Sequence, residues 1–177
     1  MQVYLLRHGE TDFNREKRMS CSDEAQLNET GKKQAQAASK LLENIPYDLV
    51  FSSPYMRARK TAEVANNGRV PIIVDNRLRE RAAGVLEGKS LSEIDLDGFY
   101  NYHKNAEYEG AENIQDFCER VWAFLEEMRE RYKDKTILLV THNIVIRAIK
   151  AYITGIPDGG NIRSYGIENG AIEEYVL

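Results

Sequence analysis

Residues 3–9, VYLLRHG, carry the clearest structural signal in the chain. Four apolar residues in a row predict a short strand that is buried on both faces, as in the parallel sheet of an α/β protein. Arg7 and His8 then follow the carboxyl end of that strand, where ligands bind in open α/β sheets, and Gly9 permits a sharp turn or a close approach to a ligand. A neutral imidazole is a nucleophile at pH 7, and a guanidinium offers paired donors to anionic oxygens. The pattern suits phosphate chemistry, although a surface turn that carries a histidine has the same pattern.

A second histidine follows a second buried strand. Residues 137–141, ILLVT, are apolar and end at His142, and residues 144–153 are apolar almost all round, which predicts a buried helix. His142 therefore lies between a strand end and a helix start, where free N–H groups and the helix dipole favour an anion. One histidine in such a place is often a packed residue. Two of them, each closing an apolar strand, indicate a shared site.

Residues 49–62, LVFSSPYMRARKTA, repeat the strand-to-helix pattern. The first three predict a strand, Ser53 predicts a helix N-cap, and Pro54 suits the first helical position. Arg57 then lies in the first turn of the helix. A cation there is mildly unfavourable with the helix dipole, so a bound anion would explain it, whereas a solvated surface charge is the plainer alternative.

Taken together, these pieces resemble the histidine phosphatase superfamily, which has the phosphoglycerate-mutase-like fold, and specifically its phosphatase branch. The matching blocks occur in the family's order and span nearly the whole chain. They are LRHGET at 6–11 with Asn14, LNETG at 27–31, SSP at 52–54 with Arg57, RER at 79–81, and VTH at 140–142 with IRA at 146–148.

The resemblance implies a role for each of these polar residues. His8 would be the nucleophile that becomes phosphohistidine, and Glu80 would donate the proton to the leaving group. The phosphoryl oxygens would be held by Arg7, Asn14, Arg57 and His142. Two guanidiniums, one imidazolium and one amide would supply a positive field without a metal or another cofactor, as phosphoryl transfer depends largely on positioning and electrostatics.

Glu80 is flanked by Arg77, Arg79 and Arg81, so an ordinary ion pair is an alternative to its acid role, and the nearby acids Glu10 and Glu87 are alternative proton donors.

Asn143 stands where the family usually has a glycine. We expect it among the phosphate-binding residues, where it would narrow the pocket or add a hydrogen bond to the substrate. The segment 19–23, MSCSD, occupies a place that usually lines the substrate side, so Cys21 in it is either a reactive thiol or a bystander. Cys118 falls on the apolar stripe of a predicted helix over 114–132, which indicates core packing.

The order of elements predicts an α/β three-layer sandwich with a mostly parallel sheet, helices on both faces and an antiparallel edge strand. A helix is expected from Gly31 with Thr30 as its N-cap. The pair Asn169-Gly170 predicts a hairpin between two strands. The polar, tyrosine-rich stretch 89–110 is expected to cover the site as a lid.

Composition fits one enzyme domain over residues 1–177, with 42% hydrophobic and 29% charged residues. The net charge of −4 and the lack of a long basic run argue against a nucleic-acid partner. No apolar run is long enough to cross a bilayer and no signal peptide is evident, so a cytoplasmic location is expected. Whether the chain forms homo-oligomers stays open.

We therefore expect a histidine acid-type phosphatase, a metal-independent phosphomonoesterase that acts on a small phosphorylated metabolite. α-Ribazole phosphate, sugar phosphates and phosphoglycerates all fit an arginine-lined pocket. A cofactor-dependent phosphoglycerate mutase and a non-catalytic module that binds phosphorylated ligands are the alternatives. Residues 91–113 are short for the closed cover that a mutase needs, which favours hydrolysis.

Overall fold

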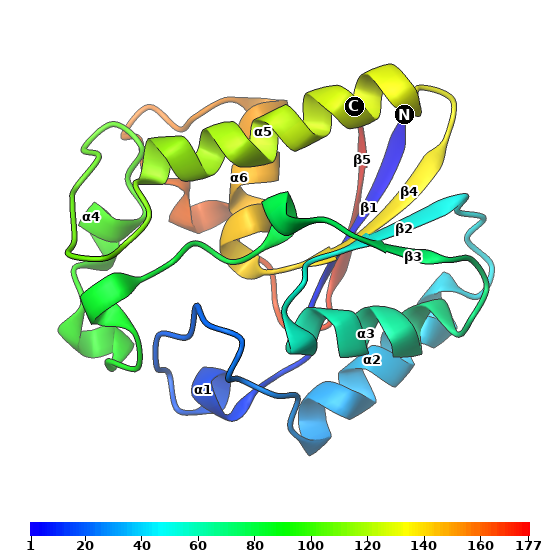
Figure 1. Ribbon diagram of the computed structural model, residues 1–177, viewed down its shortest axis with the longest axis horizontal. Coiled ribbons are helices and arrows are strands. Elements are labelled where there is room, and N and C mark those ends of the chain that lie inside the picture. Colours follow the sequence, from blue (N-terminus) through cyan, green and yellow to red (C-terminus); the bar gives the residue numbers. More distant parts are fainter.

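The computed structural model describes residues 1–177 and contains one five-stranded sheet between two layers of helices (Figure 1). The strands lie in the order β3-β2-β4-β1-β5, and the first four are mutually parallel whereas β5 pairs antiparallel with β1 at the edge. The strands are β1 (Gln2–Arg7), β2 (Leu49–Ser52), β3 (Ile72–Val74), β4 (Thr136–Thr141) and β5 (Ile172–Val176). The three-layer α/β prediction and its antiparallel edge are confirmed.

The two faces of β1 show why its sequence is apolar without alternation. Val3 and Leu5 belong to the larger core, which includes side chains of α5 (Ile114–Arg131) and α6 (Asn143–Thr154). Tyr4 and Leu6 belong to the smaller core, which includes side chains of α2 (Glu29–Leu42) and α3 (Met56–Asn66). Figure 1 shows the two helix pairs on opposite sides of the sheet. Each successive residue is buried because a helix layer covers each face.

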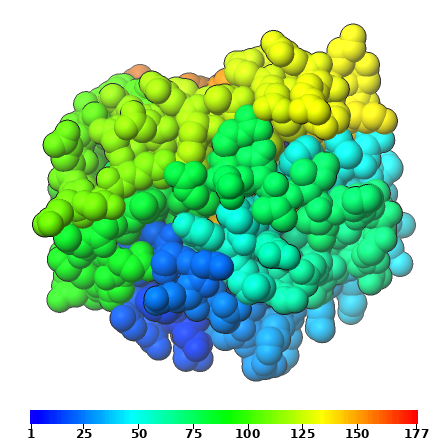
Figure 2. Space-filling view, viewed as in Figure 1, coloured from blue at the N-terminus to red at the C-terminus, as the bar shows by residue number.

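Short elements fill the loops at the carboxyl edge of the sheet. They are α1 (Asp12–Arg15), α4 (Leu96–Phe99) and the 3₁₀ turns η1 (Asn76–Leu78), η2 (Gly84–Leu86), η3 (Leu91–Glu93) and η4 (Ile162–Tyr165). The loop after α1 pairs with the segment before η3 through a bridge between Arg18 and Ser90, and Figure 2 shows these blue and green segments side by side. Ile94 and Phe99 enter the larger core, so the stretch expected as a lid is a packed wall.

Two helix starts differ from the sequence prediction. Helix α2 begins at Glu29, because Asn28 and not Thr30 is the N-cap and accepts a hydrogen bond from Gly31 N at 2.9 Å. Helix α3 begins at Met56, two residues after Pro54, and its N-cap makes no side-chain bond. The Ser53 hydroxyl instead accepts from Tyr55 N at 3.2 Å, ahead of the helix, and shares a hydrogen bond with a histidine ring of the site described below.

The expected hairpin at Asn169-Gly170 is also wrong, because no strand precedes it and η4 leads into the turn instead. Gly170 N donates to Arg7 O at 3.1 Å, and Asn169 Nδ2 donates to His8 O at 3.0 Å. The turn therefore fixes the carboxyl end of β1 before the chain returns as β5. None of the helices combines the length and the apolar character that crossing a lipid bilayer requires.

Candidate active site

Three parallel strands end at the same level and bring their following residues together. Arg7 pairs in register with Thr141, so His8 and His142 are neighbours, and His8 N donates to Thr141 O at 2.9 Å. The two imidazole rings lie edge to face with their centroids 5.2 Å apart. Ser53, at the end of β2, donates its N–H to Val140 O at 3.0 Å and completes the row.

The His8 ring is held in one tautomer. Its Nδ1 lies 2.7 Å from Gly9 O, and because a carbonyl only accepts, Nδ1 carries the proton and Nε2 keeps its lone pair. The side chain is buried, with 3% exposed. Burial, together with the charges of Arg57 and Arg7, lowers the pKa of His8 well below its usual value. The ring is therefore a neutral base with a free nitrogen.

Gly9 serves a different purpose from the one expected. Its φ is not positive, and a Cβ there would collide with the carbonyl of Gly31. Gly31 in turn leaves no room for a Cβ against the backbone of Glu10. The glycine pair lets the start of α2 pack on the loop after β1, so Gly9 permits a close approach between two backbone segments.

His142 is fully buried at the N-cap of α6. Its Nε2 shares a 2.7 Å hydrogen bond with Ser53 Oγ, while its buried Nδ1 has no hydrogen-bond partner and lies 3.8 Å from Glu80 Oε2. Burial first, and then the charge of Arg57, lowers the pKa of His142 well below its usual value. Without a bound anion the ring is neutral, whereas the sequence interpretation treated it as an imidazolium.

Two arginines supply the positive charge. Arg57, only 1% exposed, donates to the carbonyls of Ser20 and Ser22. Arg7 donates to Ile167 O at 2.7 Å, and its buried Nε has no partner. Burial and, to a lesser degree, the charge of Arg147 lower the pKa of Arg7 to about 10, so it is still protonated at neutral pH. Neither guanidinium forms a salt bridge, so both charges stay available for an anion.

Two side-chain amides, those of Asn14 and Asn143, offer N–H donors at the pocket. Asn14 Oδ1 accepts from Thr11 N and from Asn169 Nδ2, both at 3.1 Å. Asn143 Oδ1 accepts from Ile167 N at 3.0 Å. Because each oxygen is occupied, each Nδ2 group is the free end of its amide. Both asparagines line the pocket.

Glu80 lies in the pocket wall with 9% of its surface exposed. Its Oε1 accepts from Arg81 N at 3.2 Å. Burial raises the pKa of Glu80 even though Arg57, among other charges, acts in the opposite direction. A carboxyl group with a raised pKa is suited to holding and releasing a proton.

The ion-pair alternative for Glu80 is wrong, since the flanking arginines bind elsewhere. Arg77 pairs with Asp75 at 2.7 Å, and Arg79 lies 3.4 Å from Glu112. The guanidinium of Arg81 donates to backbone carbonyls.

Neither alternative proton donor lines the pocket. Glu87 accepts bonds from the backbone of Cys21 and Ser22, the nearer at 2.9 Å, and Glu10 accepts from Asn28 Nδ2 at 2.9 Å. Both hold loops in place. Cys21 does line the pocket, but burial raises its pKa well above the usual value, which makes the thiol unreactive.

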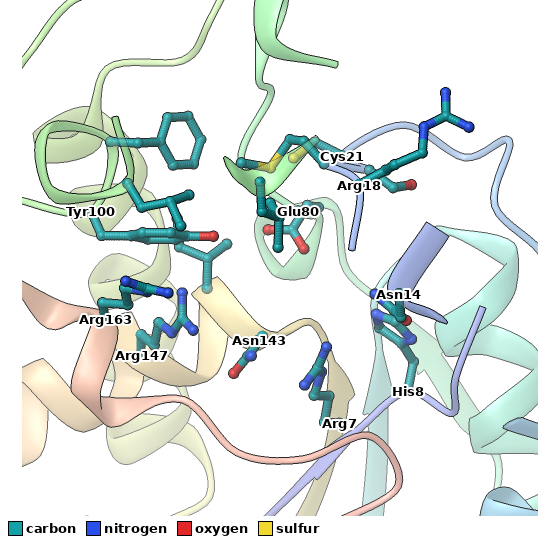
Figure 3. Close-up of a pocket in the computed structure, with 16 residues that line it drawn as sticks. Arg7, His8, Asn14, Arg18, Cys21, Glu80, Tyr100, Asn143, Arg147 and Arg163 are labelled. Carbon is teal, nitrogen blue, oxygen red and sulfur yellow. The ribbon is translucent and has the colours of Figure 1, made fainter. Parts of the chain in front are cut away.

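These residues surround one cavity of about 160 Å³ (Figure 3). Arg57 and His142 are buried next to it and are not part of its lining. The lining comprises Arg7, His8, Asn14, Arg18, Met19, Ser20, Cys21, Glu80, Leu91, Leu96, Phe99, Tyr100, Asn143, Ile144, Arg147 and Arg163. The segment 19–23 thus contributes to the substrate side as expected, through its first three residues.

Sequence reasoning assigned no role to Arg147, Tyr100 or Arg163. The available signal was Arg147 itself, because it is one of only two charges in a helix that is apolar almost all round. It also follows Asn143 by four residues, which places both on one face of α6. Tyr100 and Arg163 lie in irregular segments whose position depends on tertiary packing, so no local pattern pointed to them.

Comparison with known proteins agrees with this geometry. The family described as histidine phosphatase superfamily (branch 1) matches residues 3–176. The uncharacterized phosphatase PhoE of Bacillus subtilis is 31% identical over 154 residues, which are 86% of this chain and 77% of that protein. Phosphoserine phosphatase 1 of Hydrogenobacter thermophilus is 29% identical over 176 residues, which are 96% of this chain and 83% of that protein. The probable phosphoglycerate mutase GpmB of Escherichia coli is 32% identical over 164 residues, which are 89% of this chain and 76% of that protein.

Solved structures show the same fold. YhfR of Bacillus stearothermophilus superposes with a TM-score of 0.87 at 29% identity, over 98% of this chain and 89% of that one. A mycobacterial glucosyl-3-phosphoglycerate phosphatase in complex with VO3 superposes with a TM-score of 0.83 at 27% identity, over 98% of this chain and 91% of that one.

Proposed function

The chain belongs to the histidine phosphatase superfamily, branch 1, and we propose that it is a metal-independent phosphomonoesterase that hydrolyses a small phosphorylated metabolite through phosphohistidine at His8. The observation that carries the proposal is the 2.7 Å contact between His8 Nδ1 and Gly9 O. It leaves Nε2 as the only free ring nitrogen, next to Arg7 and Arg57, neither of which pairs with a carboxylate. Relatives named as phosphatases of phosphoserine and glucosyl-3-phosphoglycerate support a small phosphorylated substrate.

In the first step His8 Nε2 attacks phosphorus, and the bond from phosphorus to the alcohol oxygen breaks. Arg7, Arg57 and the Asn14 amide stabilise the charge on the equatorial oxygens. Glu80, whose pKa is raised by burial, enters this step as the protonated acid and gives its proton to the departing oxygen. The products are phosphohistidine, a free alcohol and an ionised Glu80.

In the second step water attacks the phosphohistidine. Glu80, now a carboxylate, takes one proton from the water as the oxygen bonds to phosphorus. The bond from phosphorus to His8 Nε2 breaks, inorganic phosphate leaves, and both side chains return to their starting states. His142, whose Nδ1 has no partner in the protein, donates to a phosphoryl oxygen throughout.

Hydrolysis is favoured over mutase chemistry by the cover of the pocket. The covering segment 91–113 lines the pocket with Leu91, Leu96, Phe99 and Tyr100. Its basic residue Lys104 is exposed and pairs with Asp97 outside the pocket. The cover therefore contributes no cation that would hold a rebinding phosphorylated product, and water competes for the intermediate.

The intermediate gives the direct test. Protein mixed with ³²P-labelled phosphomonoester and quenched should carry label that is stable to base and labile to acid, and His8→Ala should carry none. His103→Ala is the matched control because His103 is exposed and outside the pocket. Label that persists in His8→Ala refutes the assignment.

A second measurement separates the phosphatase from the mutase. With 3-phosphoglycerate and a trace of its bisphosphate, the product should be inorganic phosphate. Rapid formation of 2-phosphoglycerate with little phosphate release would favour the mutase, and tight binding of the ester without any product would favour a binding module.

We further propose that residues 1–177 act as one catalytic domain, which is supported by a family match that covers residues 3–176. The cytoplasmic location and the absence of nucleic-acid partners stay predictions from the sequence.

A further inference from the structure

The backbone around Gly9 holds the His8 ring, and a side chain from α2 holds that backbone in turn. Nδ1 of His8 donates to Gly9 O at 2.7 Å, and this carbonyl is the ring's only hydrogen-bond partner in the protein. On the other side of the same peptide, Glu10 N donates to Gln34 Oε1, also at 2.7 Å. Gln34 is in α2 and does not line the pocket. The chemistry proposed above does not use it.

Gln34 reaches Glu10 because α2 packs directly on the chain after β1. A Cβ on Gly31 would collide with the backbone of Glu10, and Gln34 follows Gly31 by three residues, which places both on one face of the helix. The stem of Gln34 lies against Gly170, where an added Cβ would come within 2.7 Å of Gln34 Cβ. Gly170 N in turn donates to Arg7 O at 3.1 Å. The amide of Gln34 is therefore held between α2 and the turn that fixes the end of β1.

The Gly9–Glu10 peptide connects the position of Gln34 to that of the His8 ring. A peptide group is planar, so its carbonyl and its N–H group move as one unit. If the N–H group lost its acceptor, the carbonyl that binds Nδ1 would be held less firmly. The ring would then be freer to turn, and Nε2 would point less often at phosphorus.

The bond to Gln34 also makes the Gly9 carbonyl a stronger acceptor. Hydrogen bonds in a chain polarise one another, and each is stronger where water is excluded. The His8 ring is buried, and it gains positive charge when Nε2 bonds to phosphorus while Nδ1 keeps its hydrogen. The polarised carbonyl oxygen faces that charge. No proton moves along the chain, so the gain is purely electrostatic.

We propose that Gln34 is a positioning residue, which acts through the Gly9–Glu10 peptide to orient the His8 ring and to stabilise its charge as phosphohistidine forms. The inference rests on the proposed function, because it takes His8 as the nucleophile. Since Gln34 lies outside the pocket lining, it should affect the rate of the chemical step and not the binding of the phosphoryl group.

Single-turnover rapid quench with ³²P-labelled 4-nitrophenyl phosphate tests the inference. Gln34→Met keeps the length of the side chain and removes the amide oxygen. At saturating substrate it should form phosphohistidine about 10-fold more slowly, as the loss of one hydrogen bond that supports a charged group implies. Gln34→Glu keeps an oxygen at the same reach and should restore the rate. Inorganic phosphate should bind all three proteins equally.

Gln36→Met is the matched control. Gln36 is also in α2 but is exposed, and two residues along a helix correspond to a rotation of about 200°. Its substitution should leave the rate unchanged. The loop keeps a second attachment in Gln34→Met, because Gly9 N donates to Thr61 Oγ1 at 3.1 Å.

Proton NMR of the His8 Nδ1–H group gives a readout that a purely structural role would not move. Its resonance should move upfield in Gln34→Met, where the carbonyl is a weaker acceptor. It should move downfield in Gln34→Glu, because a charged acceptor strengthens the chain. If Gln34→Met does not fold, Gln34→Glu decides alone, and an unmoved resonance would overturn the inference.

An unchanged rate in a folded Gln34→Met, or an equal loss in Gln34→Met and Gln34→Glu, would also overturn it. Either result leaves phosphohistidine at His8 intact, and Gln34 then only satisfies the N–H of Glu10. The absence of base-stable label in the unmodified protein, in contrast, refutes the proposed function itself.

Discussion

The two ends of the pocket are built differently. At the His8 end, the side chains follow the carboxyl ends of parallel strands, and backbone carbonyls hold them, as Gly9 O holds the His8 ring. At the Arg147 end, one side chain comes from a helix face and the others come from irregular segments, η4 and the wall after α4. The first end is fixed by the sheet, and the second depends on how loops pack on it.

The two ends of the pocket therefore differ in what holds their side chains in place. The strand register sets the distance between His8 and His142, so the reacting groups keep their geometry when loops vary. Arg163 and Tyr100 lie outside the sheet, on segments that are held by packing of Phe99 and Ile162 into the larger core.

The largest effect is expected from Arg57→Gln at the His8 end. Removing a buried donor aimed at transition-state charge costs about 100- to 1,000-fold in kcat. The loss should be equal for glycerol 3-phosphate and for 3-phosphoglycerate, because the proposed mechanism places Arg57 at the phosphoryl group alone. Steady-state kinetics on both esters measures it, with Arg59→Gln as the control on the same helix. A loss confined to one ester would show that the two ends are not separate.

Glu80→Gln should have the next largest effect, and one that depends on the leaving group. A general acid contributes about 100-fold or more to the release of an alkoxide, whereas a nitrophenolate leaves with little help. We expect a loss of about 100-fold on glycerol 3-phosphate and less than about 10-fold on 4-nitrophenyl phosphate. Equal losses on the two substrates would show that Glu80 positions other groups instead of donating the proton.

Only part of the site could be predicted from the sequence. The buried strands, the two histidines and Arg57 were predicted because strand periodicity and parallel topology dictate where strand ends meet. The start of α3 was not predicted, because the Ser53 hydroxyl bonds both Tyr55 N and the His142 ring, and His142 is close only in the folded chain.

The hairpin at Asn169-Gly170 failed for a related reason. A turn motif predicts a turn but not what the turn contacts, and here it binds the backbone of Arg7 and His8. The contact of Arg147 with the Tyr100 ring likewise depends on packing between distant segments, which a local pattern does not encode.

The protonation state of the His8 ring gives a prediction with a smaller expected effect. An imidazole with the ordinary pKa of about 6.5 is mostly protonated at pH 5.5. Burial and two arginines lower the pKa of His8, so its ring should stay neutral there, with the proton on Nδ1. Nitrogen-15 NMR of the ring reports both features. In Arg57→Gln the protonation midpoint should move upward, since one of the lowering charges is gone, and no movement would assign the shift to burial and Arg7.

The smallest expected effect concerns stability and the pH dependence that Glu80 imposes. Burial raises its folded-state pKa above the value of about 4.3 in the unfolded chain. Well below pH 4 the carboxyl group is protonated in both the folded and the unfolded state, so it does not change the free energy of unfolding. As the pH rises, the unfolded chain ionises first, so Glu80 lowers the free energy of unfolding until the pH passes its folded-state pKa.

Glu80→Gln removes that cost and keeps an oxygen for the bond from Arg81 N. The variant should therefore melt a few °C above the unmodified protein at pH 8, with a difference that shrinks toward pH 4. Glu119→Gln, an exposed carboxylate on α5 without an ion pair, should show no such trend. A difference that reversed sign at pH 8 would mean that Arg57, Arg147 and Arg7 stabilise the carboxylate by more than burial costs it. Glu80 would then be ionised before substrate binds, and the proton for the leaving oxygen would have to come from elsewhere.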